Sequence, residues 1–338
     1  PFGLARSVVL KILVRWRDRL VAPFAPARRA MWAVVAVALL PGAALAQDEV
    51  LRYGDVEEIE TLKVVADTTI SAGLVENIAG SFVEVDSLIE RGESPMAYTL
   101  DEADREAIAA ADLVVYQGLG LMPGFIEAAE ARDEADRVEL SEGIPDFRLI
   151  RKDGEINPHT YHSPSLLQYA VDHLTRQLKE KLQPAAGEIE GNRLRINIEL
   201  QSLVRETEGL LEEVPRTERL LVTDNDVLAY FAKEYYFTLL DVRDEADSQE
   251  AVELINRYDT PSVFRVAGVG DGAVEEWLES HRGSDIPESV KLAPTLSGLW
   301  LGEPNLPTGT YIGLFRQNVN DLMLGLRPLP EAGEREIR

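Results

Sequence analysis

The feature that most constrains the fold is a β-α alternation that the sequence carries twice. In the first half, apolar segments rich in β-branched residues alternate with segments of helical period. They predict strands at 62–70, 81–89 and 112–118, with helices at 72–80 and 99–111 between them. Because a β-α-β-α-β order favours a parallel sheet with helices on both faces, the first half is expected to form an α/β lobe.

Two consecutive helical segments then interrupt the alternation. Ser163-Pro164 has the form of an N-cap and a first helical residue, and a longer helix is expected over 184–214. Its apolar stripe is marked by Ile196, Leu200, Leu203, Leu210 and Val214. The alternation restarts with a strand at 219–226, and a last helix is expected at 309–326. The sequence therefore predicts an α/β fold of two similar lobes, each with a parallel sheet flanked by helices, joined by a long rigid helix.

The segment before the first lobe has the pattern of a secretory signal. Residues 1–30 hold seven basic residues and one acid, and they precede an apolar run at 31–40 and an A-x-A cleavage site at 44–46. Since the run is short for a membrane span, we expect a cleaved signal and secretion across the cytoplasmic membrane, to the periplasm or the cell exterior. The sequence starts without a methionine, which we interpret as a fragment or a misplaced start upstream of the signal.

The expected organisation has six parts. They are a signal with its upstream basic segment (1–46), an acidic linker (47–60), an N-terminal α/β lobe (61–183), a connecting helix (184–215), a C-terminal α/β lobe (216–327) and a tail (328–338).

Composition excludes several classes of protein. The sequence contains no cysteine, which excludes thiol catalysis, disulfides and cysteine-bound metal centres. A lipidated N-terminal cysteine is excluded on the same ground, so the protein is predicted not to be a lipoprotein. The formal net charge is −25, and without residues 1–46 it is about −31. A surface this negative repels nucleic acid and anionic lipid, so no nucleic-acid partner is expected.

The loop INPHTYHSP, residues 156–164, concentrates the candidate binding chemistry. His159 and His162 stand three residues apart in it. Imidazole is a common metal ligand, but a site also needs partners from elsewhere in the chain. There is no G-x-S-x-G elbow, no dinucleotide-type G-x-G-x-x-G and no nucleophile paired with a positioned base. An enzyme is therefore not expected.

Several motifs recur in the order of one known family. They are KVVADTTISAGLVENIAG (63–80), VEVDSLIERGESPMAYTL (83–100), AADLVVYQGLGL (110–121), INPHTYHSP (156–164), RLLVTDNDVLAYFAKEYYF (219–237) and GTYIGLFRQNV (309–319). The chain resembles, from about residue 61 to 326, the zinc- and manganese-type solute-binding proteins of bacterial ABC importers. The resemblance implies an extracytoplasmic receptor of two α/β lobes, with a rigid connecting helix and a metal ion in the cleft between the lobes.

The resemblance also implies where the ligands lie. The family's histidine in a D-P-H-x-Y loop corresponds to Met96, and its histidine in an N/D-P-H loop corresponds to His159. A histidine or glutamate after a V-T strand end corresponds to Asn225, and an aspartate before a T/S-Y dipeptide corresponds to Gly309. The implied site is therefore Met96, His159 and Asn225, with one histidine of the usual set retained.

These positions supply no negative charge, although a dication in a dry cleft is stabilised by anionic donors. Tight binding of zinc or manganese by these residues alone is not expected. Three substitutions are open: a carboxylate from elsewhere, a second imidazole, or Cu(I) held by thioether and imidazole. The candidates for the carboxylate are Asp224, Asp226 and Glu303, and the candidate for the second imidazole is His162. Met96 and His159 are the candidates for holding Cu(I).

Each substitution has a structural alternative. Aspartates that flank a helix start commonly act as caps. A second histidine in a loop commonly faces solvent, and Met96 is suited to packing against the opposite lobe.

Three functions are compatible with these residues. The first is a receptor that delivers a ligand, most simply a transition-metal ion such as zinc, manganese or copper, to an ABC permease and its ATPase. The second is a family member whose metal site has decayed, with no bound metal and an interaction, scaffold or adhesin-like role. The third is a receptor for a non-metal small ligand in the same cleft. A monomer is expected in each case.

Overall fold

The computed structural model describes residues 60–152, 154–269 and 272–327. The predicted signal, nearly all of the acidic linker and the tail lie outside these residues. Within the described ranges, no helix combines the length and the apolar character that a membrane crossing requires.

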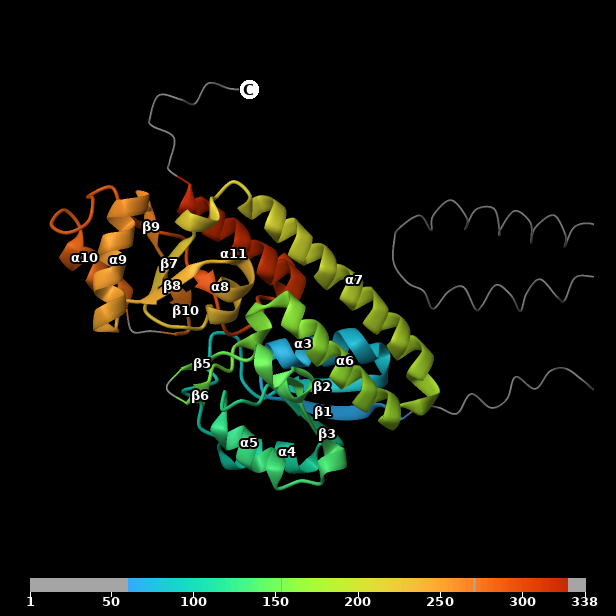
Figure 1. Ribbon diagram of the computed structural model, residues 1–338. Helices are drawn as coiled ribbons and strands as arrows, with labels where there is room; N and C mark the ends of the chain where they lie inside the picture. The colour runs from blue at the N-terminus through green and yellow to red at the C-terminus, as the bar shows by residue number, and fades with distance from the viewer. Residues whose placement is uncertain (1–59, 153, 270–271, 328–338) are drawn as a thin grey trace, which may run out of the picture. The chain divides into compact units, whose positions relative to one another are not determined.

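The first lobe is built on a four-stranded parallel sheet in the order β2-β1-β3-β4 (Figure 1). Its strands are β1 (Leu62–Ala66), β2 (Val83–Ser87), β3 (Leu113–Tyr116) and β4 (Arg137–Glu139). Its helices are α3 (Thr69–Ala79), α4 (Glu102–Ala110), α5 (Pro123–Glu130) and α6 (Pro164–Lys181), and a small hairpin joins β5 (Arg151–Lys152) to β6 (Glu155–Ile156). The N-cap at Ser163 and the helix start at Pro164 are confirmed.

Side-chain alternation explains why helices cover both faces of this sheet. Leu113 and Val115 of β3 belong to the core formed with α3 and α6. Val114 and Tyr116 point to the other face and pack with α4 and α5. Because every residue of β3 is buried, the strand is a continuous apolar run, as is typical of a central parallel strand.

The predicted first strand was too long. β1 ends at Ala66, and α3 begins at Thr69. The reason is a helix cap, because the Thr68 side chain accepts a hydrogen bond from the backbone N–H of Ser71. Asp67 therefore lies at the carboxyl end of β1, immediately before the N-terminus of α3.

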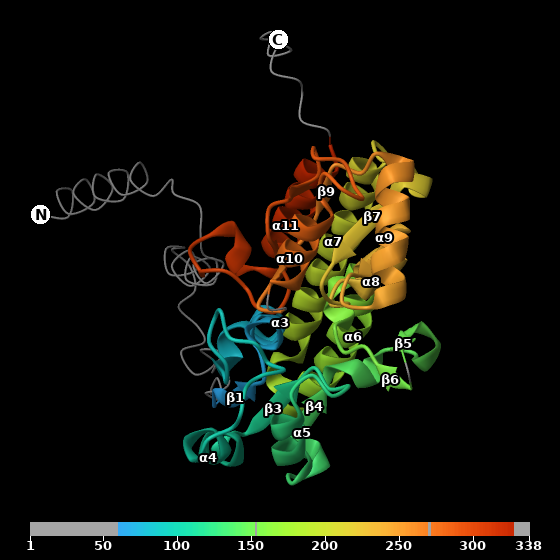
Figure 2. The same ribbon diagram turned by 90° about the vertical axis from the view of Figure 1, so that its left-hand side faces the viewer.

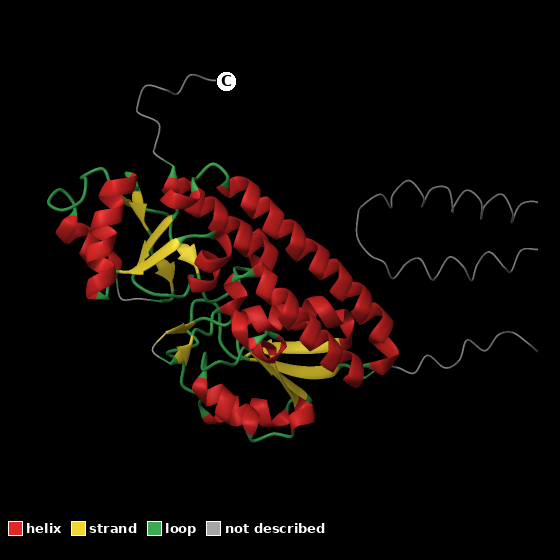
Figure 3. Ribbon diagram, in the orientation of Figure 1, coloured by secondary structure: helices red, strands yellow, loops and turns green. Residues whose placement is uncertain are grey.

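The second lobe repeats the α/β plan with a less regular sheet (Figure 3). β7 (Leu220–Thr223) pairs in parallel with β8 (Thr238–Asp241), whereas β9 (Ser262–Val263) pairs with β11 (Lys291–Leu292), and β10 (Val266–Ala267) with β12 (Leu296–Ser297). Prolines at 261 and 294 flank these two-residue strands and cannot donate ladder hydrogen bonds. The helices are α8 (Ala229–Tyr235), α9 (Glu245–Tyr258), α10 (Ala273–His281) and α11 (Tyr311–Leu326). The predicted α/β fold class is confirmed, but the second sheet is more fragmented than predicted.

Helix α7 (Ala186–Leu211) supplies side chains to the cores of both lobes. Ile196 and Leu200 pack in the first-lobe core, and Leu203 and Leu211 pack in the second-lobe core. Figure 2 shows α7 alongside α11, which also contacts it. One helix shared by two cores restricts motion of one lobe against the other. The predicted stripe was wrong at its end: Leu210 is exposed, and Val214 lies beyond the helix.

Candidate ligand-binding site

The candidate site lies where strands of the two lobes end. Asp67 follows β1, Gln117 follows β3, and Asp224 follows β7. Ligands of open parallel sheets characteristically bind outside the carboxyl ends of the strands. All three side chains are buried.

Direct hydrogen bonds join the lobes around these strand ends. The backbone N–H of Leu301 donates to Thr69 Oγ1 over 2.9 Å. The hydroxyl of Tyr311 donates to the backbone carbonyl of Tyr161 over 2.6 Å, and Asn157 Nδ2 donates to the carbonyl of Asp226 over 2.9 Å. The loop 156–164 thus forms the first-lobe side of the interface.

His159 is buried at the N-terminus of a short 3₁₀ turn, Thr160–His162. Its Nδ1 lies 2.8 Å from Tyr161 Oη, and its Nε2 has no hydrogen-bond partner among the described residues. When Nδ1–H donates to Tyr161, Nε2 keeps the lone pair that a metal ion needs, and the tyrosine fixes the ring orientation. Burial, together with the nearby His162, lowers the pKa of His159 to about 3, so the imidazole is neutral at pH 7.

His162 does not face solvent, because it is only 5% exposed. Its Nε2–H donates to the backbone carbonyl of Gly298 over 2.7 Å, a contact from the first lobe to the second. Burial lowers its pKa to about 4, although the bond to Gly298 acts in the opposite direction. Since Nε2 carries the proton in this bond, His162 links the two lobes here, and the lone pair of its neutral ring is on Nδ1. Its role as a second imidazole ligand stays a prediction.

Met96 does not share the environment of the other predicted ligands. It lies in a turn and is 43% exposed, whereas His159 and Asn225 are each 2% exposed. The alternative, that Met96 packs against the opposite lobe, stays a prediction.

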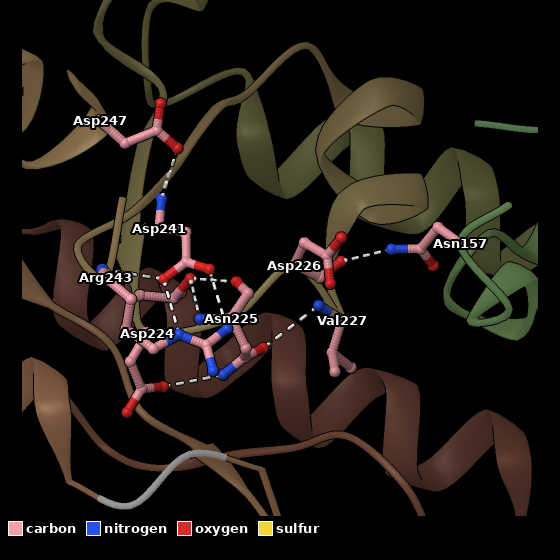
Figure 4. Close-up of polar contacts among 9 residues, drawn as sticks. Asn157, Asp224, Asn225, Asp226, Val227, Asp241, Arg243 and Asp247 are labelled. Atoms are coloured by element: carbon pink, nitrogen blue, oxygen red, sulfur yellow. Dashed lines mark hydrogen bonds and ion pairs between the residues drawn. The ribbon is translucent and has the colours of Figure 1, made fainter. Parts of the chain in front are cut away.

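Asn225 is engaged by its own loop (Figure 4). Its Nδ2 donates to Asp224 Oδ1 over 2.8 Å, and its Oδ1 accepts from the backbone N–H of Val227 over 3.2 Å. Asp224 is fully buried, and its Oδ2 has no hydrogen-bond partner in the described part of the chain. Asp226 is half-buried and contacts Asn157 through its backbone carbonyl.

A guanidinium balances the acids after β7. Arg243 forms an ion pair with Asp241 at the end of β8, with Nη2 2.8 Å from Oδ2. Asp241, followed by Asp224 and Asp226, raises the pKa of Arg243. Figure 4 shows Arg243 beside Asp224 and Asp241. The second-lobe carboxylates proposed as substitute ligands therefore already have a cationic neighbour.

Gly309 has no room for a side chain. A Cβ built there would lie 2.4 Å from the carbonyl oxygen of Glu303 and 2.8 Å from Pro304 Cα. Both neighbours are backbone atoms, so an aspartate at 309 requires the loop before α11 to move.

An open cavity of about 620 Å³ lies between the lobes, but His159, Met96 and Asn225 do not line it. Its wall includes the carboxylates of Glu76, Glu90 and Glu303, together with Arg91 and Gly309. Because three carboxylates and one guanidinium line this cavity, its net negative charge attracts cations.

Asp67 is the site residue that the sequence analysis missed. It is 1% exposed, and its Oδ2 accepts the backbone N–H of Gln117 over 2.8 Å. Burial raises its pKa, although hydrogen bonding by Ser71, Gln117 and Thr68 opposes the shift. The available signal was an aspartate directly after a buried apolar strand, in VVADTT.

Of the predicted ligands Met96, His159 and Asn225, the structure buries His159 and Asn225 but leaves Met96 exposed. Among the described residues, no three side chains of His, Cys, Asp and Glu converge in a metal-site geometry. Of Met96, His159 and Asn225, His159 retains a free donor atom in a buried setting, and of the proposed substitutes Asp224 does so through Oδ2.

The fold and this site define a class, the two-lobed α/β receptors that hold a ligand between the strand ends of their lobes. A family model described as zinc-uptake complex component A, periplasmic, matches residues 64–324. The chain belongs to this family, which confirms the resemblance seen in the sequence.

Individual relatives agree with this assignment. The chain is 29% identical to the manganese-binding lipoprotein MntA of Bacillus subtilis over 280 residues, covering 79% of this chain and 90% of that protein. It is 26% identical to the zinc-binding protein TroA of Treponema pallidum over 278 residues, covering 79% and 88%. The solved structure of periplasmic zinc-binding TroA matches the fold with a TM-score of 0.72 at 24% identity, covering 79% of this chain and 100% of that one.

The prediction that the protein is not a lipoprotein is wrong by this comparison. MntA of Bacillus subtilis and several further relatives carry the word lipoprotein in their names. The physical reason is that a lipid anchor depends on one residue outside the folded lobes, so neither the fold nor the cysteine content of the lobes decides it.

Proposed function

We propose that this protein is the extracytoplasmic solute-binding receptor of a metal-type ABC importer, and that its cargo is a transition-metal ion held between the lobes near His159. The partners are then a membrane permease and its ATPase, and the receptor acts as a monomer. Members of the family are solute-binding transport components, and no enzymatic role is proposed.

His159 carries this proposal. Its ring is buried between the strand ends, oriented by Tyr161, neutral at pH 7 and open at Nε2. These are the properties of a histidine that ligates a metal through one nitrogen and is positioned through the other. The names of the relatives describe MntA as manganese-binding and TroA as zinc-binding.

A second candidate is a family member whose metal site has decayed and which serves as an interaction or scaffold protein. It is favoured by the internal bonding of Asn225, the exposure of Met96 and the backbone packing at Gly309. In that case the hydrogen bonds between the lobes hold the two lobes together without cargo.

Equilibrium dialysis of the purified, chelator-stripped chain against Zn²⁺, Mn²⁺, Fe²⁺ and Cu⁺, followed by elemental analysis, separates the two candidates. The receptor predicts one equivalent of a retained metal and thermal stabilisation by it. Both effects are expected to disappear in His159→Ala and to persist in His281→Ala, which alters a histidine on α10 far along the chain. No metal above background in the wild-type chain would favour the decayed-site candidate.

A further inference from the structure

Asp67 is a buried carboxylate that has no cationic partner among the described residues. It is 1% exposed, and none of the ion pairs among the described residues includes it. Its Oδ2 accepts from the N–H of Gln117, whereas Oδ1 has no hydrogen bond of good geometry in the described part of the chain, although Thr68 and Ser71 lie close enough to lower the pKa of the carboxyl. A buried carboxylate is costly unless it is paired, well hydrogen-bonded or bound to a cation.

Two hydrogen bonds connect Asp67 to the loop that contains His159. Gln117, whose backbone binds Asp67, donates its side-chain Nε2–H to Thr160 Oγ1 over 2.8 Å. Thr160 directly follows His159 in the turn that orients the imidazole. The end of β1 and the histidine loop are therefore joined through two successive contacts.

Asp224, at the end of β7, is a second buried carboxylate, but its electrostatic surroundings differ from those of Asp67. Asp224 is equally buried and also has one oxygen without a partner, but it lies beside Arg243 and accepts from Asn225. A cation added at Asp224 would have to compete with this guanidinium. No such competitor is present among the described residues around Asp67.

Building on the proposed function, we infer that Asp67 supplies the negative charge that the cargo site lacks, with its free Oδ1 facing the bound metal ion alongside His159 Nε2. Carboxylate and imidazole together suit zinc or manganese. Cu(I) prefers thioether and imidazole donors, so a carboxylate beside His159 favours zinc or manganese over copper.

The decisive experiment compares Asp67→Asn with the wild-type chain by calorimetric titration of Mn²⁺ and Zn²⁺. Asparagine keeps the shape and can still accept from Gln117, but it removes the charge. We expect the dissociation constant for the preferred ion to rise by at least about 100-fold, because loss of a ligand should exceed the 10–100-fold cost of losing an outer-shell partner.

Glu234→Gln is the matched control, because it neutralises another poorly exposed carboxylate with an unpartnered oxygen, on α8. It is expected to bind the metal within about threefold of the wild-type chain. Asp224→Asn neutralises the carboxylate at the opposite strand end and is the comparison variant, which should weaken binding less than Asp67→Asn because Arg243 already lies beside Asp224.

The outcomes are distinguishable. If the wild-type chain binds metal and His159→Ala does not, but Asp67→Asn binds as tightly as the wild type, Asp67 is no ligand and this inference is overturned. Loss of metal binding in Asp224→Asn in place of Asp67→Asn would overturn it as well. If the wild-type chain binds none of the ions, the proposed function itself has failed. Should Asp67→Asn not fold, Asp67→Ser applies the same test with a smaller neutral side chain.

Discussion

The carboxyl ends of β1 and β7 face the same interface with the same residue type, yet their electrostatic settings differ. Asp67 after β1 and Asp224 after β7 are both buried, and each leaves one carboxylate oxygen without a partner among the described residues. Among the described residues, Asp224 has a guanidinium nearby, that of Arg243, and Asp67 has none. Equivalent backbone positions thus acquire different chemistry from their neighbours, and the two lobes contribute unequally to one site.

The largest expected effect concerns the histidine side of the interface in the metal-free protein. The folded-state pKa of His162, about 4, lies below the ordinary value of 6.5, so between these pH values the unfolded chain binds a proton that the folded chain does not. His162 alone should lower the free energy of unfolding by about 3 kcal/mol as the pH falls through this window.

Urea denaturation at several pH values measures how steeply the free energy of unfolding depends on pH. His162→Gln, whose amide can still donate to Gly298, should show a weaker dependence than the wild-type chain. Part of the dependence should remain in this variant, because burial also lowers the pKa values of His159 and His173. Equal slopes in the two proteins would show that His162 does not titrate with unfolding.

A second test introduces a carboxylate on the second-lobe side. Gly309→Asp should lower the free energy of unfolding by about 1–3 kcal/mol, because its Cβ meets the backbone of Glu303 and Pro304. Gly187→Asp, in the first turn of α7 with open space around it, is the control and should be close to neutral. Tighter metal binding by Gly309→Asp without loss of stability would mean that the loop before α11 opens readily.

A third test changes the strand end that lacks a cation. In the metal-free protein at pH 7, Asp67→Asn should raise the free energy of unfolding by about 1–2 kcal/mol, because a buried uncompensated charge is replaced by an amide. Asp224→Asn should give no such gain. A loss of stability in Asp67→Asn, measured by chemical denaturation, would show that the carboxylate is well solvated by its hydrogen bonds.

The smallest effect on the free energy of unfolding is expected from a change at Arg243. Arg243→Gln should destabilise the protein by about 0.5–1 kcal/mol, and less at high salt, because its ion pair with Asp241 is partly exposed. Arg257→Gln removes a more exposed pair with Glu253 and should cost less. If Arg243→Gln were neutral at low salt, the contrast between the two strand ends would rest on Asp67 alone.

Much of this molecule was predictable from local pattern. The strands of the first lobe, the Ser163 cap and the long helix between the lobes follow from hydrophobic periodicity and capping chemistry. His159 was found through its loop motif. The predicted end of β1 was wrong because threonines suit both a strand and a helix cap, and a hydrogen bond from Ser71 decided between them.

The site itself was less predictable. Met96 and Asn225 occupy the sequence positions of ligands, yet one is exposed and the other is bonded within its own loop. Asp67 escaped notice because nothing in VVADTT shows whether a carboxylate will meet a cation. Whether Met96 and Asn225 contribute to metal binding stays a prediction.

The sequence by itself determined the α/β class, the family and the loop that contains His159, because these depend on short-range periodicity and on motif order along the chain. Only the tertiary structure decided which donors are free. Burial, the packing at Gly309 and the distance of Asp67 and Asp224 from a guanidinium arise from segments far apart in the sequence. Since the stability of a buried charge depends on its surroundings in space, the chemistry of the cleft became visible only once the two lobes were assembled.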